Sequence, residues 1–262
     1  MHVIESASNE KIKNAVRLCA SSKARREKKE FFLEGLRLCR DAALSGVEVK
    51  SFFYTENALE KHRADVDFIS ERAQSSFLVS SSVSQKLADT QTPQGFFCVC
   101  SFLEEKTEEM LLKKGKFIAL ENVQDPANLG AVSRTAEALG ITALIVENGC
   151  DIYNVKAQRA AMGSLLRLPV LKTAGLFSLL ERCREKGFKV YSTTPDSSAK
   201  SITQADMSGN VIAVIGNEGN GVSEKTASVC EKITIPMNGR AESLNASAAA
   251  ALTMWEIVRS GI

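Results

Sequence analysis

The sequence predicts an α/β protein in two parts, of which the second contains a mostly parallel sheet. From Lys116 onward, short apolar segments alternate with polar loops and amphipathic segments. This alternation of strand, loop and helix is typical of parallel sheets that bind ligands at the carboxyl ends of their strands. The run Val211–Ile215 is apolar throughout, which predicts a strand buried on both faces. Residues 102–115 are rich in Glu and Lys and separate this part from a first, smaller α/β part.

These observations predict a first domain over residues 1–101, a linker over 102–115 and a second domain over 116–262. The composition of the linker fits a solvated helix on the first domain equally well. The chain has 262 residues, of which 44% are hydrophobic, and this is enough to bury one large core or two modest ones.

The charge and the cysteines exclude several classes of protein. A net charge of +2 excludes a uniformly basic surface but leaves room for a local basic patch. Seven scattered cysteines without a Cys-x-x-Cys pair, and only two histidines, provide too few ligands for a zinc site, so we expect no metal. Reduced, mostly buried thiols indicate a cytoplasmic protein. The N-terminus lacks the apolar core of a signal peptide, and no apolar run is long enough to span a membrane.

The first domain is expected to alternate helices and strands. Helices are predicted over residues 8–19, 31–44 and 81–88, and strands over 49–54, 77–79 and 96–101. Between the first two helices lies a basic cluster that consists of Lys23, Arg25, Arg26, Lys28 and Lys29. Only Glu27 opposes it, so the cluster is either a phosphate-binding patch or a solvated turn.

The second domain is predicted to join five strands by helices and loops. We expect strands over residues 117–120, 143–146, 188–191, 211–215 and 233–235, and helices over 129–139, 176–186 and 246–258. Three polar loops each begin where one of these strands ends. Because a parallel sheet brings such loops to one edge, they are the candidates for a ligand site.

The first loop runs from Glu121 to Gly130 and continues into a helix that contains Arg134. The side chain of Asn128 suits a helix N-cap, because its oxygen accepts a hydrogen bond from a free backbone N–H. Taken alone, this segment is more simply a capped helix with one exposed arginine.

The second loop, Gly216-Asn-Glu218-Gly219-Asn-Gly221, follows the buried strand. Its glycines permit unusual backbone dihedrals and let a ligand approach the main chain. The order of the glycines is not that of the dinucleotide fingerprint, and the Lys-Ser/Thr of a P-loop is missing. Since Glu218 would repel phosphate, a sugar hydroxyl or a sulfonium suits this loop better, and a flexible turn is the plain alternative.

The third loop leads from Ile235 to an Ala-rich helix, for which Ser243 or Asn245 is a suitable N-cap. Residues 246–251 are only Ala and Ser, so another backbone can pack closely against this helix. Tight packing alone would explain this composition.

Together the three loops resemble the SpoU/TrmH family of RNA ribose 2′-O-methyltransferases, within the SPOUT superfamily. The matching segments are Asp125-Pro-Ala-Asn128-Leu-Gly130 through Arg134-Thr-Ala, then Gly216-Asn-Glu218-Gly219-Asn-Gly221-Val-Ser, then Ile235-Pro-Met237 through Gly239 and Ser243-Leu-Asn245-Ala-Ser. Val222 stands where leucine is commoner in the family. The resemblance covers about residues 116–262, and the first domain more weakly resembles the ribosomal-protein-like α/β domain that binds substrate in such enzymes.

This resemblance implies a fold and a set of partners. It implies that the C-terminal sheet forms a trefoil knot, that the protein is a homodimer with its active site at the subunit interface, and that S-adenosylmethionine is the cofactor. Carried over position by position, it places the cofactor against the backbone of Gly216, Ile235 and Leu244, with Thr193 lining the same pocket.

The catalytic residues that the resemblance implies are Arg134, Asn128, Glu218, Ser243 and Asn245. Arg134 is expected nearest the reaction and the other four around it as a polar network. A free guanidinium is a poor base because its pKa exceeds about 12. We therefore expect Arg134 to bind the neighbouring phosphate and stabilise the developing oxyanion, while the group that takes the proton stays open.

The substrate implied by the resemblance is structured RNA, and the basic cluster at Lys23–Lys29 is expected to bind its phosphates. Ribosomal RNA is favoured over tRNA, because the two-domain arrangement resembles that of rRNA-modifying members. A non-catalytic RNA-binding module and a nucleotide-dependent oxidoreductase are the alternatives. The three intact motifs argue against the module, and the order of the glycines argues against the oxidoreductase.

Overall fold

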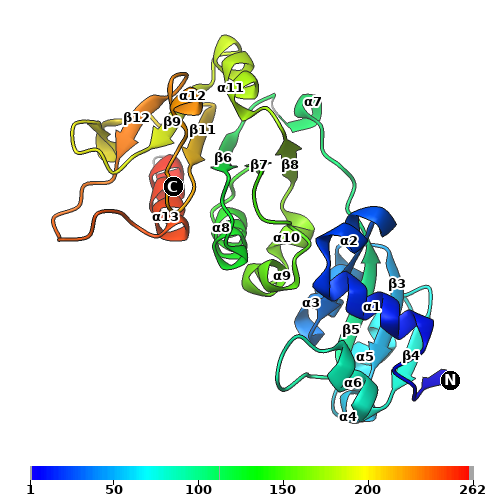
Figure 1. The fold of residues 1–262 in the computed structure, drawn as a ribbon. Helices are drawn as coiled ribbons and strands as arrows, with labels where there is room; N and C mark the ends of the chain where they lie inside the picture. Colours follow the sequence, from blue (N-terminus) through cyan, green and yellow to red (C-terminus); the bar gives the residue numbers. More distant parts are fainter. Residues whose placement is uncertain (1, 112, 260–262) are drawn as a thin grey trace. The chain divides into compact units, whose positions relative to one another are not determined.

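The structure is a computed structural model that describes residues 2–111 and 113–259. Met1, Leu112 and residues 260–262, which fall in the predicted first domain, linker and second domain, lie outside the described residues. The chain forms two compact units, whose elements are labelled in Figure 1. The first unit comprises Met1–Glu104 and Asp151–Arg167, and the second comprises Glu105–Cys150 and Leu168–Ile262. The units are thus interleaved along the chain, whereas the predicted domains follow one another.

The first unit is built on a mixed five-stranded sheet. Its strands are β1 (His2–Ile4), β4 (Ser76–Val79), β3 (Val49–Tyr54), β5 (Phe96–Ser101) and β2 (Glu30–Glu34), given in their order across the sheet. The first three are parallel, and β5 runs antiparallel to both β3 and β2. The helices are α1 (Glu10–Ala20), α2 (Ser22–Lys28), α3 (Leu36–Leu44), α4 (Glu56–Lys61), α5 (Arg63–Ser70), α6 (Ser81–Leu87), α9 (Val155–Ala161) and α10 (Ser164–Arg167).

The helix predicted over residues 31–44 is wrong in its first part. Glu30–Glu34 forms β2, whose apolar residues Phe31, Phe32 and Leu33 are fully buried and pair with β5. Gly35, with a φ of 104°, then leads into α3. A short apolar run fits helical and strand periodicity equally, so the pairing with β5 decides.

The second unit contains a seven-stranded sheet. Across the sheet the strands are β10 (Lys200–Ser201), β12 (Glu231–Thr234), β9 (Lys189–Thr193), β11 (Val211–Ile215), β6 (Lys116–Glu121), β7 (Ala143–Glu147) and β8 (Val170–Thr173). Every pair of neighbours is parallel, which confirms the predicted parallel sheet. The helices are α7 (Glu108–Leu111), α8 (Pro126–Ala138), α11 (Leu176–Glu185), α12 (Glu224–Ala227) and α13 (Ala246–Arg259). The trefoil knot stays an expectation of the resemblance.

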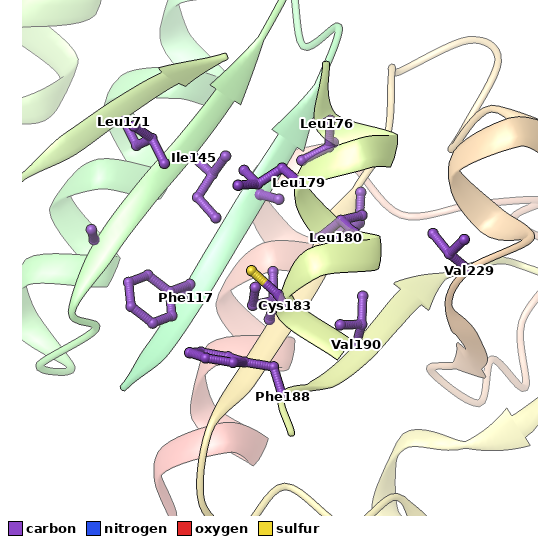
Figure 2. Packing of buried hydrophobic residues seen from close by; sticks show 14 residues of the cluster. Phe117, Ile145, Leu171, Leu176, Leu179, Leu180, Cys183, Phe188, Val190 and Val229 are labelled. Carbon is purple, nitrogen blue, oxygen red and sulfur yellow. The ribbon is translucent and has the colours of Figure 1, made fainter. Parts of the chain in front are cut away.

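Helices cover both faces of this sheet, so its central strands are buried. Helix α11 places Leu176, Leu179, Leu180 and Cys183 against the apolar side chains of the strands (Figure 2). Helix α13 packs against α8, β6 and β11. All five residues of β11 are buried, as the continuous apolar run predicts. None of the helices in the described ranges is both long and apolar enough to cross a membrane.

Candidate active site

The three predicted loops follow β6, β11 and β12 at the carboxyl edge of the parallel sheet. β6 and β11 are hydrogen-bonded neighbours, and β12 lies on the far side of β9. A cavity of about 440 Å³ lies at this edge. The glycine loop after β11, the residues that follow β9, and the loop between β12 and α13 line it. The sheet therefore brings together segments that are far apart in the sequence.

Four residues were predicted to hold the cofactor, and all four line this cavity: Thr193, Gly216, Ile235 and Leu244. Gly216 has no space for a side chain, because a Cβ atom there would lie 2.1 Å from the carbonyl carbon of Gly221. The hydroxyl of Thr193 donates to the carbonyl oxygen of Val214 at 3.2 Å. Main chain therefore forms much of the wall beside Gly216.

A chain of hydrogen bonds links the three loops. The Nδ2 of Asn128 donates to Oε1 of Glu218 at 2.8 Å, and the Nδ2 of Asn245 donates to Oδ1 of Asn128 at 3.0 Å. Asn128 is buried, and Glu218 lines the cavity. The structure thus brings together three of the five predicted catalytic residues through direct contacts.

The carboxylate of Glu218 has a lowered pKa. Burial alone would raise the pKa, but the hydrogen bonds from Asn128 and from the backbone N–H groups of Gln124 and Asp125 outweigh it. Glu218 is therefore ionised at neutral pH and accepts hydrogen bonds from the first loop.

The other two predicted catalytic residues are placed differently. Ser243 lines the cavity and makes no side-chain hydrogen bond to the described part of the chain. Arg134 is exposed on α8, is not among the residues that line the cavity, and has no ion pair or hydrogen bond within residues 2–111 and 113–259. Its guanidinium is consequently available to a ligand that comes from outside this chain.

The predicted N-cap at Asn128 is wrong, and the one at Asn245 is confirmed. Helix α8 begins at Pro126, and its N-cap is Asp125, which accepts from the N–H of Ala127 at 2.9 Å. Asn128 lies inside the helix, which directs its amide toward Glu218. Asn245 accepts from the N–H of Ser247 at 2.9 Å at the start of α13.

Two further side chains, which were not among the predicted site residues, fix the loops. Asn217 accepts from the N–H groups of Gly219 and Asn220 and donates to the carbonyl oxygen of Asn122 at 2.9 Å. Glu121, which is buried, accepts from the N–H and the hydroxyl of Ser223 at 2.8 and 2.7 Å. Glu121 directly follows the predicted strand 117–120, and Asn217 lies two residues after Ile215, so a polar residue near the end of an apolar strand was the available signal.

The basic cluster of the first unit is only partly exposed. Arg25 is 3% exposed; its Nε donates to Asp151 at 2.8 Å and its Nη1 to the carbonyl oxygen of Leu18 at 2.6 Å. Burial and ion pairing remove its guanidinium from solvent, which disfavours the expected contact with RNA. Lys23, Arg26, Lys28 and Lys29 are exposed.

Comparison with known proteins agrees with this geometry. The SpoU rRNA methylase family model matches residues 115–255, and the MRM3-like substrate binding domain model matches residues 9–98. The chain is 32% identical over 262 residues to the 23S rRNA (guanosine(2553)-2′-O)-methyltransferase RlmP of Bacillus subtilis, covering 98% of this chain and 99% of that protein. It is 35% identical over 144 residues to the 23S rRNA (guanosine-2′-O-)-methyltransferase RlmB of Xanthomonas campestris, covering 54% of this chain and 57% of that one.

A solved structure shares the whole fold. The AdoMet-bound rRNA methyltransferase from Sinorhizobium meliloti matches with a TM-score of 0.85 at 26% identity, covering 99% of each chain. The family model spans more than half of the present chain, and RlmP aligns with nearly all of it. The chain therefore belongs to the SpoU rRNA methylase family.

Proposed function

We propose that this protein transfers a methyl group from S-adenosylmethionine to a ribose 2′-hydroxyl of ribosomal RNA. The observation on which this depends is that the second and third motif loops line one cavity and that Asn128 of the first loop is hydrogen-bonded to both, through Glu218 and Asn245. The family and the relatives described above support the same chemistry, since two of them are named as 23S rRNA 2′-O-methyltransferases.

The cavity fits S-adenosylmethionine. Its volume of about 440 Å³ lies within the range of small-molecule sites, roughly 300–1,000 Å³. Apolar side chains such as Ile215, Ile235 and Leu244 line it together with main chain at Gly216. These groups would hold the adenosine and methionine parts, and the cofactor supplies the methyl group when it is bound.

The residues of this chain then position the RNA and stabilise charge. Arg134 does not line the cavity of its own chain, so this role depends on an active site at the subunit interface of the proposed homodimer. There its exposed guanidinium would bind the phosphate next to the target ribose and stabilise the oxyanion as the hydroxyl loses its proton. Asn128, Glu218 and Asn245 hold the first loop and the start of α13 in place. Ser243, on the cavity wall, is placed to hydrogen-bond the substrate or the cofactor. Holding the reactants in this geometry lowers the barrier by about 7–11 kcal/mol in favourable cases.

The protein is proposed to act as a homodimer in the cytoplasm. Leu252 and Trp255 lie one turn apart on α13 and are 46% and 50% exposed, which is unusual for large apolar side chains. A second copy of α13 would cover them. All seven cysteines are thiols, and reduced thiols are typical of proteins in a reducing compartment.

The proposal is tested with purified protein, tritiated S-adenosylmethionine and unmodified 23S rRNA or tRNA made by transcription. We expect methylation of the rRNA at a ribose, which alkaline resistance of the adjacent bond detects. The Arg134→Ala variant should bind S-adenosylmethionine in calorimetry as the parent does but lose methyl transfer. Methylation of tRNA alone would show that tRNA, and not rRNA, is the substrate. Failure of the parent to bind the cofactor would support the non-catalytic RNA-binding module.

A further inference from the structure

The buried position of Arg25 changes which cations of the first unit are available to RNA. Of the exposed members of the basic cluster, Lys23 lies 3.8 Å from Glu27, and the ammonium of Lys29 lies 5.9 Å from the centre of the Phe102 ring. Lys28 forms no salt bridge or side-chain hydrogen bond with the described residues. The sequence alone gave no reason to distinguish these three lysines.

Helix α1 carries two further exposed cations. Lys13 and Arg17 are four residues apart on α1 and are both exposed, whereas Ile12, Ala15 and Leu18 on its other side are buried. Residues at this spacing are neighbours on a helix surface. Arg17 makes no side-chain hydrogen bond or salt bridge within residues 2–111 and 113–259.

The carboxylate of Glu10 interacts electrostatically with all three cations. Glu10 forms a salt bridge with Lys13 at 2.8 Å, and Lys13, Arg17 and Lys28 all lower its pKa. Asn14 of α1 donates to Glu30, two residues after the end of α2, at 3.2 Å, so the end of α2 lies beside α1. We call the surface formed by Lys13, Arg17 and Lys28 the α1–α2 face. Three cations around one carboxylate give this face a local excess of positive charge in a protein whose whole net charge is only +2.

Arg25 holds the two helices of this face in a fixed arrangement. Its Nη1 donates to the carbonyl oxygens of Leu18 and Cys19 at the end of α1, at 2.6 and 3.1 Å. Ser21 ends α1 and caps α2 by accepting from the N–H of Ala24 at 3.2 Å. Cations held on ordered helices lose less freedom when they bind a phosphate chain than cations on a loose turn do.

We propose that the α1–α2 face, formed by Lys13, Arg17 and Lys28, binds the phosphate backbone of the RNA substrate. This inference rests on the proposed function and identifies a surface outside the cavity. Side chains of this kind contact phosphates without distinguishing bases, so they contribute affinity and salt dependence and leave the choice of nucleotide to the second unit.

The test compares two triple variants with the parent protein. The first is Lys13→Gln/Arg17→Gln/Lys28→Gln, and the matched control is Lys61→Gln/Arg63→Gln/Lys86→Gln, which removes two exposed lysines and one exposed arginine elsewhere in the first unit. Binding of transcribed 23S rRNA is measured between about 50 and 200 mM salt. We expect the first variant to bind about tenfold more weakly or worse, and its salt slope to fall by about two to three, as loss of three phosphate contacts requires.

The remaining measurements separate this inference from the proposed function. Affinity for S-adenosylmethionine and the rate at saturating RNA should match the parent in both variants, with only the KM for RNA raised in the first. Equal affinity and salt slope in the first variant and the parent, while the parent methylates rRNA, would overturn this inference alone. An equal loss in the control would also overturn it, and a parent that fails to bind rRNA would overturn both.

Discussion

Gly216 is the residue of the cavity at which a side chain is least tolerated. A Cβ atom there would lie 2.1 Å from the carbonyl carbon of Gly221 and 2.2 Å from the nitrogen of Val222, both of which are main-chain atoms. The Gly216→Ala variant must therefore displace the glycine loop, at a cost of about 1–3 kcal/mol. We expect cofactor affinity in calorimetry to fall about tenfold or more, since about 1.4 kcal/mol is one factor of ten.

Gly239→Ala is the matched control for this substitution. Gly239 lies in the loop before α13, and no atom lies within 4 Å of the position that its Cβ would take. Affinity close to that of the parent is expected. If both alanine variants bound S-adenosylmethionine like the parent, the glycine loop would not form the wall of the cofactor site.

The carboxylate of Glu218 makes the stability of the fold depend on pH. Its pKa is lower in the folded protein than its ordinary value of 4.5, so its contribution to stability is present above that value and is lost as the pH falls through the folded pKa. The parent should therefore lose more thermal stability between about pH 5 and pH 3 than Glu218→Gln does. Identical losses in the two proteins, measured by calorimetric unfolding, would show that the hydrogen bonds to Glu218 do not stabilise the fold.

Single residues show what sequence reasoning could and could not predict. Asp125 before Pro126 is the better helix-start signal, because proline is favoured at the first helical position, and it outweighs the capping tendency of Asn128. The burial of Arg25 could not be predicted, because its partner Asp151 lies 126 residues away and no local pattern links them. The meeting of Asn128 with Glu218 and Asn245 followed from three motifs at the ends of parallel strands.

At the scale of elements, the segment from Asp151 to the end of α10 is held in the first unit by buried contacts. Val155 belongs to the apolar core of that unit, and Asp151 pairs with Arg25, whose side chain is 3% exposed. The Asp151→Asn variant leaves a buried guanidinium without its counter-charge. We expect the free energy of unfolding to fall by about 2–4 kcal/mol in urea titrations.

An exposed salt bridge in the second unit serves as the control for Asp151→Asn. Lys200 and Glu231 are 2.9 Å apart, and their side chains are 42% and 50% exposed. Lys200→Gln should cost less than about 1 kcal/mol, because exposed pairs are screened by water. An equally small effect for Asp151→Asn would mean that the segment is not anchored through this pair.

Elements were predictable where periodicity and length agreed. The strands Val49–Tyr54, Phe96–Ser101 and Val211–Ile215 were predicted with the bounds that the structure gives them. The short strand β8 and helix α9 were not predicted, because Val170–Thr173 and Val155–Ala161 contain too few large apolar residues to establish a period. The N-cap Asn154 was the local signal for α9.

For the whole molecule, the proposed dimer depends on the exposed apolar face of α13. Leu252→Glu/Trp255→Glu places two charges on that face and should convert a dimer into a monomer at micromolar concentration, as sedimentation velocity would show. Val3→Glu/Leu44→Glu is the control, because these apolar residues of the first unit are also more than half exposed. A monomeric parent, or a dimer that survives the α13 substitutions, would contradict the proposed interface.

The interleaving of the two units has a consequence for biosynthesis. The ribosome completes residues 1–104 before it makes β6 and β7, and only afterwards Asp151–Arg167, which the first unit needs for its core and for Arg25. At about 5–20 residues per second, synthesis reaches the end of α10 roughly 3–13 seconds after residue 104. During this time the sheet of the first unit lacks α9 and α10. Throughout that interval, apolar surface that α9 later covers is open to chaperones, so translation speed over this stretch bears on the yield of folded protein.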